Sequence, residues 1–538
     1  MNIYFMGMIL SMIVYIVLGL VISRQVKDVN DFFVAGRQAP TFLIVGSLVA
    51  SYCSTGLFMG DVGEAYAGFY TPFMITAMML VGGYVIGSVF FGKYLRRSEA
   101  LTIPEFFGNR FNSRPLRILA AVTAIITMTV YLLSVMQGIG TLMNYVTGVN
   151  YNICILLALI TFAVLTVTSG SKGVLITDTL MFSIFTGASL IGVVIIVGKL
   201  GGWTTAVTNV TKLNPTIFSW SGDLSHLYPT GTENIIWAVM TGLTWVAVCA
   251  VGPWQSSRYL MAKNEHTVVR SAVWATIGVT LLEFFLPTVG ALLNVYSDQI
   301  PSASLSMIWA TMNLLPKVLG VIVLTGVLAA GISSATTFLS LIGSSVANDI
   351  MVIDDDKKKL RYGRVSIIVV CVVVMILAYF NPPQIYIIML LGGTVVVCSW
   401  FPVCIASVWS KRVTKTGAFL GMLLGFVGCA VMKIIGAMGV SLPIYFDSFF
   451  IGLLANILGL VIGSALTQVT KEEKEFRNRL FVVPKEELDV SEMKKTKRTI
   501  GYFIVFGVIV AVALGAAILQ SSLIVAVNGA NSNPLILQ

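Results

Sequence analysis

Residues 46–70 read GSLVASYCSTGLFMGDVGEAYAGFY, an apolar run in which glycine, serine and threonine recur every few residues. The run is long enough to cross a bilayer, because about 20 mainly apolar residues suffice for a spanning helix. Its glycines weaken a regular helix, and a helix that is interrupted at membrane depth leaves backbone groups free to bind a ligand. We therefore expect a broken helix that forms part of a binding site.

A second interruption lies in residues 241–260, TGLTWVAVCAVGPWQSSRYL, where Gly252 and Pro253 divide an apolar run. Proline has no backbone N–H and clashes with the preceding helical turn. Each interrupted segment opens a block of five apolar runs. Interruptions at corresponding positions of two halves are typical of inverted-repeat membrane proteins with a site between the halves. Close packing of small residues stays an alternative for either segment alone.

The composition places the chain in a membrane. Of its 538 residues, 57% are hydrophobic and 11% are charged, and the mean hydropathy is +0.90, whereas soluble proteins carry about 25% charged residues. The seven cysteines lie in apolar runs and the basic residues in short connectors, which argues against a disulfide framework and against nucleic-acid binding. The chain has no G-x-x-x-x-G-K-[ST] motif for ATP and only two histidines. We expect an all-α membrane protein that is not an enzyme.

Fourteen apolar runs are long enough to be transmembrane helices. They lie near 3–23, 41–68, 71–95, 116–146, 151–171, 174–199, 234–262, 267–296, 317–348, 361–380, 384–410, 416–440, 444–468 and 500–527. With the N-terminus outside, the outer segments hold only Lys199, Lys212, Lys317 and Lys433 of the 34 basic residues, as the positive-inside rule requires. We therefore predict a multi-pass protein of the plasma (inner) membrane with both termini extracellular or periplasmic.

These runs divide the chain into seven predicted segments. They are an accessory helix at 1–27, a first inverted repeat of helices 2–6 at 28–200, an extracellular loop at 201–233, a second inverted repeat of helices 7–11 at 234–411, helices 12 and 13 at 412–469, a cytoplasmic linker at 470–499, and helix 14 with an extracellular tail at 500–538. The linker mixes both charge signs, which favours a solvated tether over a regulatory site.

Polar residues at membrane depth are the functional candidates. Residues 326–350, GVLAAGISSATTFLSLIGSSVANDI, carry seven hydroxyl side chains, which either ligate a small alkali cation or bond to neighbouring helices. Asp61, Glu64, Asp178 and Glu283 are acids within apolar runs, and such residues are functional candidates by default. No lysine or arginine lies in the middle of a core run. We therefore expect a neutral, zwitterionic or cationic ligand, or an anionic one whose charge is offset by a bound cation and by helix N-termini.

Five motifs, in this order, resemble those of the sodium:solute symporter family. They are DVNDFFVAGRQAP at 28–40, LTIPEFFGNRFNSRPLR at 101–117, SKGVLITDTLMF at 171–182, QSSRYLMAKNEH at 255–266 and LAAGISSATTFLSLIGSSVANDI at 328–350. The resemblance covers roughly residues 28–470. It implies a LeuT-type fold of about 14 helices, in which helices 2–11 form a core of two inverted five-helix repeats. One N-terminal and three C-terminal helices are additions to that core.

The resemblance also implies site residues. A sodium site would use the hydroxyls of Ser333 and Ser334 and the backbone carbonyls of Ala50, Cys53 and Ala330. Asp178 would serve a second cation site, with a structural carboxylate as an equal alternative. Asp61 and Glu64 would lie in the outer vestibule. The substrate candidates are Ser54, Leu57, Trp245, Trp254 and Ser257.

We therefore expect sodium-coupled import of a small organic solute by alternating access, with Na+ as the coupling ion and no organic cofactor. The break at Gly252, Pro253 and Trp254 lacks the amide side chain that the family's sugar transporters have there, so an amino acid, an amine or zwitterion, or a short carboxylate is favoured over a sugar. A solute sensor, a proton-coupled symporter using Asp178 and a passive channel are the alternatives. Expected partners are the lipid bilayer and the solute but no nucleic acid. A small accessory membrane subunit or a homo-oligomer stays open.

Overall fold

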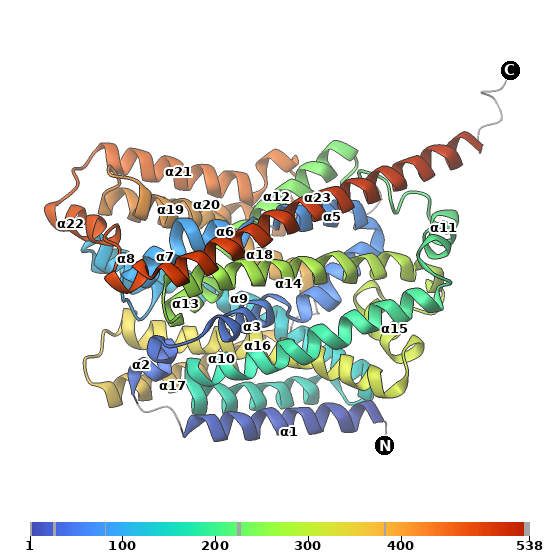
Figure 1. Ribbon diagram of the computed structural model, residues 1–538, viewed down its shortest axis with the longest axis horizontal. Helices are drawn as coiled ribbons and strands as arrows, with labels where there is room; N and C mark the ends of the chain where they lie inside the picture. The colour runs from blue at the N-terminus through green and yellow to red at the C-terminus, as the bar shows by residue number, and fades with distance from the viewer. Residues whose placement is uncertain (1–2, 25–27, 81, 223–227, 381–383, 532–538) are drawn as a thin grey trace.

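The computed structural model describes residues 3–24, 28–80, 82–222, 228–380 and 384–531, and in these ranges the chain is helical without a strand. Twelve helices of the described residues are long and apolar enough to cross a membrane. They lie side by side along the long axis of the molecule (Figure 1). The all-α membrane fold is confirmed.

The predicted number of fourteen spans is not confirmed. The runs predicted at 41–68 and 71–95 form one irregular stretch, in which 56–97 qualifies as a single span and Thr41–Tyr52 is a shorter apolar helix. The last predicted run, 500–527, lies within the helix Val490–Asn531, which is not among the twelve. Irregular helices make the number of spans hard to predict, because a run of apolar residues does not show where the chain bends.

The first half contains the elements that carry one of the two breaks. They are α1 (Ile3–Ser23), α2 (Val29–Val34), η1 (Ala35–Arg37), α3 (Thr41–Tyr52), η2 (Gly56–Asp61), α4 (Val62–Glu64), η3 (Ala65–Phe69), α5 (Tyr70–Leu80), α6 (Gly83–Gly87), η4 (Ser88–Gly92), α7 (Lys93–Arg97), α8 (Ile103–Phe111), α9 (Arg114–Thr147) and α10 (Tyr151–Lys199).

The second half contains the other break and the C-terminal helices. Its elements are α11 (Trp203–Leu213), α12 (Gly231–Val251), α13 (Pro253–Met261), α14 (Glu265–Leu292), η5 (Leu293–Tyr296), η6 (Ala303–Leu305), α15 (Ser306–Leu314), α16 (Lys317–Ser345), η7 (Val346–Ile350), α17 (Asp356–Phe380), α18 (Ile385–Ser399), α19 (Phe401–Trp409), α20 (Lys415–Ala437), η8 (Ile444–Phe446), α21 (Ser448–Ala465), α22 (Lys471–Leu480), η9 (Lys485–Leu488) and α23 (Val490–Asn531).

Both predicted interruptions are present. The first helix, α3, ends at Tyr52 because Cys53 leaves the helical region (φ −74°, ψ 63°), and the chain resumes as the π-helical η2. The second, α12, ends at Val251, since Gly252 is extended (φ −53°, ψ 134°) and Pro253 starts α13. Proline suits a first helical position, where its missing N–H costs no hydrogen bond.

The helix α10 consists of two spans, Tyr151–Thr168 and Gly170–Lys199, which agree with the two predicted runs. Gly170 has φ +55° and ψ −161°, a conformation that is essentially restricted to glycine. A Cβ atom at this position would also lie 2.5 Å from the ring of Phe32. The reversal between the two spans therefore depends on this glycine.

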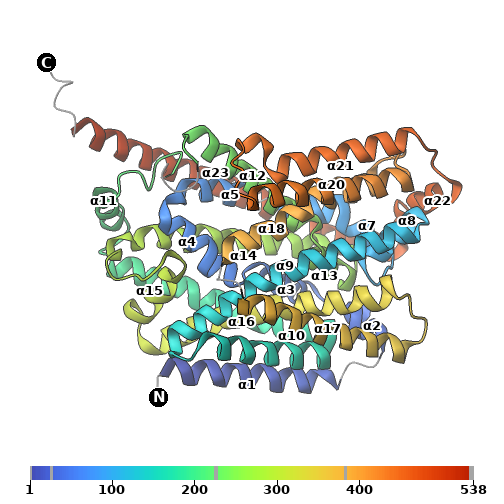
Figure 2. The same ribbon diagram turned by 180° about the vertical axis from the view of Figure 1, so that it is seen from behind.

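The two ends of the bundle differ in their elements. The starts of α1 and α15 lie at one end together with α11 and the end of α23, whereas α2, α8 and α22 lie at the other (Figures 1 and 2). The pair α20–α21 forms one edge of the bundle, opposite α1, and α23 crosses one face diagonally (Figure 1). The predicted linker 470–499 is largely structured, since it contains α22, η9 and the first turns of α23.

Candidate functional site

The broken end of α3 faces the hydroxyl-rich part of α16. Ser54 donates its backbone N–H to the Tyr52 carbonyl at 2.8 Å, so the Ala50 carbonyl loses the N–H that would bond to it in a regular helix. Across the contact, Ser334 Oγ donates to the Ser51 carbonyl at 3.3 Å. Backbone and hydroxyl oxygens from α3 and α16 therefore meet in one buried place.

The predicted sodium ligands Ala50, Cys53, Ala330, Ser333 and Ser334 are all buried. A hydroxyl that ligates a cation must point its hydrogen toward another acceptor. Ser334 donates its hydrogen to a carbonyl of α3, and Ser333 donates its hydrogen to a carboxylate oxygen at 2.5 Å. The oxygen lone pairs of both serines are therefore not used by these bonds. The five-ligand site itself stays a prediction.

Asp178 belongs to a buried ion pair. Its Oδ1 accepts a hydrogen bond from Ser333 at 2.5 Å, and its Oδ2 accepts one from Ser47 Oγ at 2.5 Å and one from Arg258 Nη2 at 3.3 Å. Arg258 also donates from Nε to Ser47 Oγ at 3.0 Å and from Nη2 to Thr337 at 2.5 Å. Both charged side chains are buried, so the network is shielded from water.

Arg258 shows that one expectation was wrong, because a fixed positive charge does lie within the core. Arg258 lies near the end of the predicted run 234–262, where a long side chain usually reaches toward water. Instead, the short helix α13 that follows the break turns the guanidinium into the protein. Because Arg258 already neutralises Asp178, the pairing favours the structural alternative for this carboxylate. The second cation site there stays a prediction.

Tyr131 of α9 joins three of the predicted substrate residues. Its ring centroid lies 5.3 Å from that of Trp254 and 6.4 Å from that of Trp245, and its hydroxyl is within hydrogen-bond reach of Ser54. Phe338 of α16 closes the cluster with its ring centroid 5.3 Å from that of Trp254. Aromatic groups of this kind bind apolar and cationic parts of a ligand. The sequence carries no local signal that would have identified Tyr131.

The other two predicted substrate residues lie elsewhere. Leu57 is buried in η2. Ser257 lines a cavity of about 20 Å³ together with Pro253, Thr102 and Ser345, toward the end of the bundle that holds α8. The five predicted substrate residues therefore do not line a single cavity in this conformation.

A vestibule of about 350 Å³ lies at the opposite end, and its walls include Gly60, Glu64, Ser304 and Tyr386. Glu64 is one of its wall residues, and its placement on the outer side of the membrane stays a prediction. Asp61 does not line this vestibule: it is only 5% exposed and points into the protein. Glu64 belongs to the short helix α4 that follows Asp61, and it lines the vestibule with Gly60 and Gly63, whereas Asp61 lies against α14.

The end that holds α8 is closed by a polar network between α8, α9 and η7. Asp349 Oδ1 accepts hydrogen bonds from Arg117 Nε at 2.9 Å and from Thr102 Oγ1 at 2.8 Å. Asn348 Nδ2 donates to Glu105 Oε2 at 2.8 Å. The cavities beneath this network hold only about 20 and 10 Å³. In the described conformation the vestibule is therefore much larger than these two cavities at the other end.

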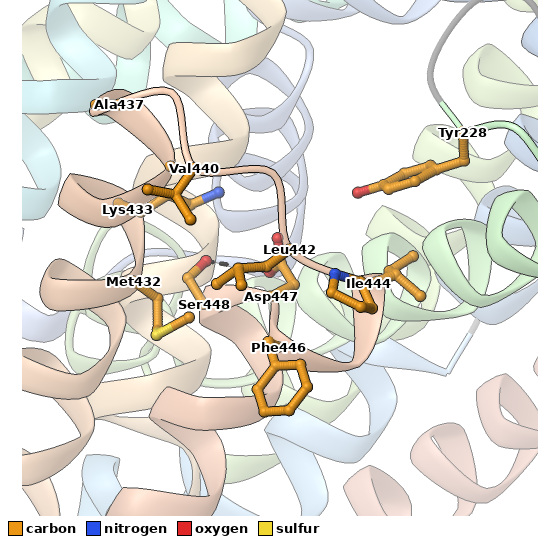
Figure 3. Close-up of a pocket in the computed structure, with 12 residues that line it drawn as sticks. Tyr228, Met432, Lys433, Ala437, Val440, Leu442, Ile444, Phe446, Asp447 and Ser448 are labelled. Carbon is orange, nitrogen blue, oxygen red and sulfur yellow. Dashed lines mark hydrogen bonds between the residues drawn. The ribbon is translucent and has the colours of Figure 1, made fainter.

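A further cavity of about 300 Å³ lies at the turn between α20 and α21 (Figure 3). Its walls include Lys433, Leu442 and Asp447, and Tyr228 reaches toward it from the segment before α12 (Figure 3). It shares no wall residue with the vestibule. Since α20 and α21 lie at the edge of the bundle, this cavity is remote from the two helix breaks.

Comparisons with known proteins agree with this architecture. The profile of the "Sodium:solute symporter family" matches residues 32–425. The sodium/proline symporter of Salmonella typhimurium is 23% identical over 87% of this chain and 94% of its own length. The sodium/pantothenate symporter of Escherichia coli is also 23% identical, over 82% of this chain and 92% of its own length.

Solved structures show the same fold. A substrate-bound, outward-open structure of a Na+-coupled sialic acid symporter matches with a TM-score of 0.73 and 18% identity, covering 88% of this chain and 99% of that chain. The nucleobase-cation-symport-1 family transporter Mhp1 matches with a TM-score of 0.56 and 12% identity, covering 83% of this chain and 98% of that chain. The fold is thus of the LeuT type, as the resemblance implied. Because the family profile spans most of the chain, this protein belongs to the sodium:solute symporter family, with Na+ as the coupling ion.

Proposed function

We propose that this protein imports a small organic solute together with Na+ by alternating access across the plasma membrane. The observation that carries the proposal is the contact between the broken end of α3 and α16, where Ser334 Oγ meets the Ser51 carbonyl at 3.3 Å. A cation bound there joins two helices that belong to different halves of the core. Na+ would therefore stabilise one arrangement of the two halves over the other.

The large vestibule, the small cavities at the opposite end and the polar network there support an outward-facing starting state, given the orientation with both termini outside. Na+ would bind first, at Ala50, Cys53, Ala330, Ser333 and Ser334. The solute would then reach the aromatic cluster between the breaks, and the network around Asp349 would open to release both inward. The coupling is reciprocal, because a cation that tightens solute binding must itself be bound more tightly by the solute-loaded protein.

The solute would be an amino acid, an amine or zwitterion, or a short carboxylate. The relatives that carry proline and pantothenate support this range of small organic molecules. Two alternatives have less support. A proton-coupled mechanism would require Asp178 to release and bind protons, but Arg258 pairs with it at 3.3 Å. A sensor would bind the solute without accumulating it, whereas the family to which the chain belongs consists of symporters.

Uptake into proteoliposomes tests the proposal. Radiolabelled amino acids, betaines and short carboxylates are offered with an inward Na+ gradient or with a proton gradient alone, to the wild type and to the double variant Ser333→Ala/Ser334→Ala. We expect one solute to accumulate only with Na+, and the variant to need a much higher Na+ concentration. Accumulation driven by protons alone would contradict the coupling. A variant that behaves as the wild type would contradict the ion site.

A further inference from the structure

Two acids from different halves of the core meet inside the protein. Asp61 ends η2 and Glu283 lies in the middle of α14, and each side chain is only 5% exposed. Glu283 lies between Gly278 and Gly290 of α14, which pack against Val49 of α3 and Val62 of α4. It is therefore close enough to Asp61 for the two acids to interact electrostatically. The pair sits where α14 packs against α3, η2 and α4, immediately next to the first helix break.

This acid pair has no counter-charge in the described part of the chain. The ion pairs there involve neither Asp61 nor Glu283. Asp61 Oδ1 and Glu283 Oε1 are buried and have no hydrogen-bond partner. Burying ionised carboxylates without a partner is costly, and two of them repel each other. The pair is therefore stable only with a proton or with a positively charged group between or beside the two acids.

A second, independent observation points to a ligand. Tyr386 of α18 is 7% exposed, and neither its hydroxyl nor the buried hydroxyl of Thr241 has a hydrogen-bond partner among the described residues. The Tyr386 ring packs beside Gly60. Tyr386 also lines the vestibule, together with Gly60, the residue before Asp61. Unused polar atoms thus surround the acid pair on the side from which a solute would enter.

Aromatic rings supply the remaining wall. Tyr52 packs edge-on against Trp245 with the ring centroids 5.7 Å apart. Tyr386 packs against Phe73 at 5.7 Å and against Trp237 at 6.3 Å. Aromatic faces attract organic cations, most strongly where water is excluded. The acid pair is therefore set in surroundings that suit a charged organic group.

We propose that Asp61 and Glu283 together bind the ammonium group of the transported solute, so that the solute is an amine or a zwitterionic amino compound. This inference rests on the proposed function. An ammonium group offers several N–H donors, enough for Asp61 Oδ1, Glu283 Oε1 and the Tyr386 hydroxyl. A proton shared by the two acids would not give Asp61 Oδ1 and Glu283 Oε1 the partners that they lack. For Na+, the freed carbonyl and hydroxyls at α3 and α16 form the better-suited oxygen site.

Binding to the purified full-length protein tests the inference. Probes are proline, 4-aminobutyrate and butylamine, each compared with the analogue that lacks the ammonium group: cyclopentanecarboxylate, pentanoate and 1-butanol. Thermal stabilisation is titrated in saturating NaCl and again in KCl. We expect at least one amine to bind and its analogue to bind roughly 30-fold more weakly or not at all, because a buried charge pair loses this much when one partner is removed. Stabilisation by none of the amines, or equally by the analogues, overturns the inference.

Substitutions test whether the preference for amines depends on Asp61 and Glu283. In Asp61→Asn and Glu283→Gln we expect the preference for the amine over its analogue to disappear, while stabilisation by Na+ persists. The exposed Asp298→Asn, at the same end of the bundle, is the matched control. If the two variants instead lose stabilisation by Na+ and keep the amine preference, the pair is a cation site and the inference is wrong. If a variant fails to fold, the wild-type comparison of amines with their analogues still tests the inference, because a lack of preference for the amines overturns it.

The two proposals fail differently. If amines bind through the acid pair but uptake does not depend on Na+, the proposed function is wrong and this inference stands. If uptake depends on Na+ but amines and their analogues are not distinguished, this inference is wrong and the proposed function stands.

Discussion

Removal of the buried guanidinium of Arg258 should destabilise the protein strongly. In Arg258→Met the apolar stem is kept, but Asp178 loses its counter-charge at 3.3 Å, and Ser47 and Thr337 lose donors at 3.0 and 2.5 Å. Breaking a buried ion pair from one side typically costs about 3–5 kcal/mol, since the remaining charge is left without a partner. Asp178 keeps the hydroxyls of Ser47 and Ser333, so we expect a loss near the lower figure.

The double variant separates the pair from the rest of the network. Asp178→Asn keeps an oxygen for the two serine hydroxyls but removes the negative charge, and Arg258 then becomes the unpaired group. In Arg258→Met/Asp178→Asn neither member of this pair is charged. We therefore expect the double variant to lose about 2 kcal/mol less stability than the sum of the two single losses. This difference is within the usual range for residues in contact.

Reversible unfolding in mixed detergent and SDS micelles measures these free energies. If the unfolding free energy of Arg258→Met lies within about 1 kcal/mol of the wild-type value, the reasoning is refuted, because removal of a solvated or unpaired arginine has so small an effect. Additive single losses would refute it as well. The outcome also bears on proton coupling, since a carboxylate that exchanges protons during transport cannot depend on a permanent salt bridge.

Three other changes have defined outcomes. Ser334→Ala removes one predicted sodium ligand and a bond between α16 and α3, so the Na+ concentration for half-maximal uptake should rise roughly tenfold, equivalent to ~1.4 kcal/mol. Arg117→Gln cuts the 2.9 Å contact to Asp349, so a cysteine placed at Ser345 should react faster with a membrane-permeant thiol reagent. Gly170→Ala forces a side chain into a glycine-only conformation and should lower stability by about 1–3 kcal/mol or more in the same unfolding assay.

Each of these changes has a matched control. Thr325→Ala removes a hydroxyl that bonds only within its own helix, and uptake that is equally impaired in both variants would argue against a sodium ligand at Ser334. Arg114→Gln removes an exposed charge from the same helix as Arg117 and should leave thiol labelling unchanged. Gly187→Ala adds a methyl group into open space. An equal loss of stability there would contradict a special role for Gly170.

The sequence alone determines much of the architecture, because a lipid-exposed helix has to satisfy its backbone hydrogen bonds within itself. The requirement for about 20 apolar residues locates most spans. The breaks at Cys53 and Gly252 are also readable, since glycine clusters and an internal proline act on the local backbone. The hydroxyl-rich run of α16 can also be recognised in the sequence, because its side chains follow one regular helical period.

Only the tertiary structure decides which side chains meet. Arg258 and Asp178 are 80 residues apart, and Asp61 and Glu283 are more than 200 apart, so no local pattern pairs them. Side-chain direction also depends on irregular backbone: the short helix α13, which begins at a proline after the break, turns Arg258 inward. Side-chain direction follows from sequence spacing only where the helix is regular. A broken helix exposes the backbone groups that a transport site needs. At the same break the helical periodicity ends, so sequence spacing no longer predicts where the neighbouring side chains point.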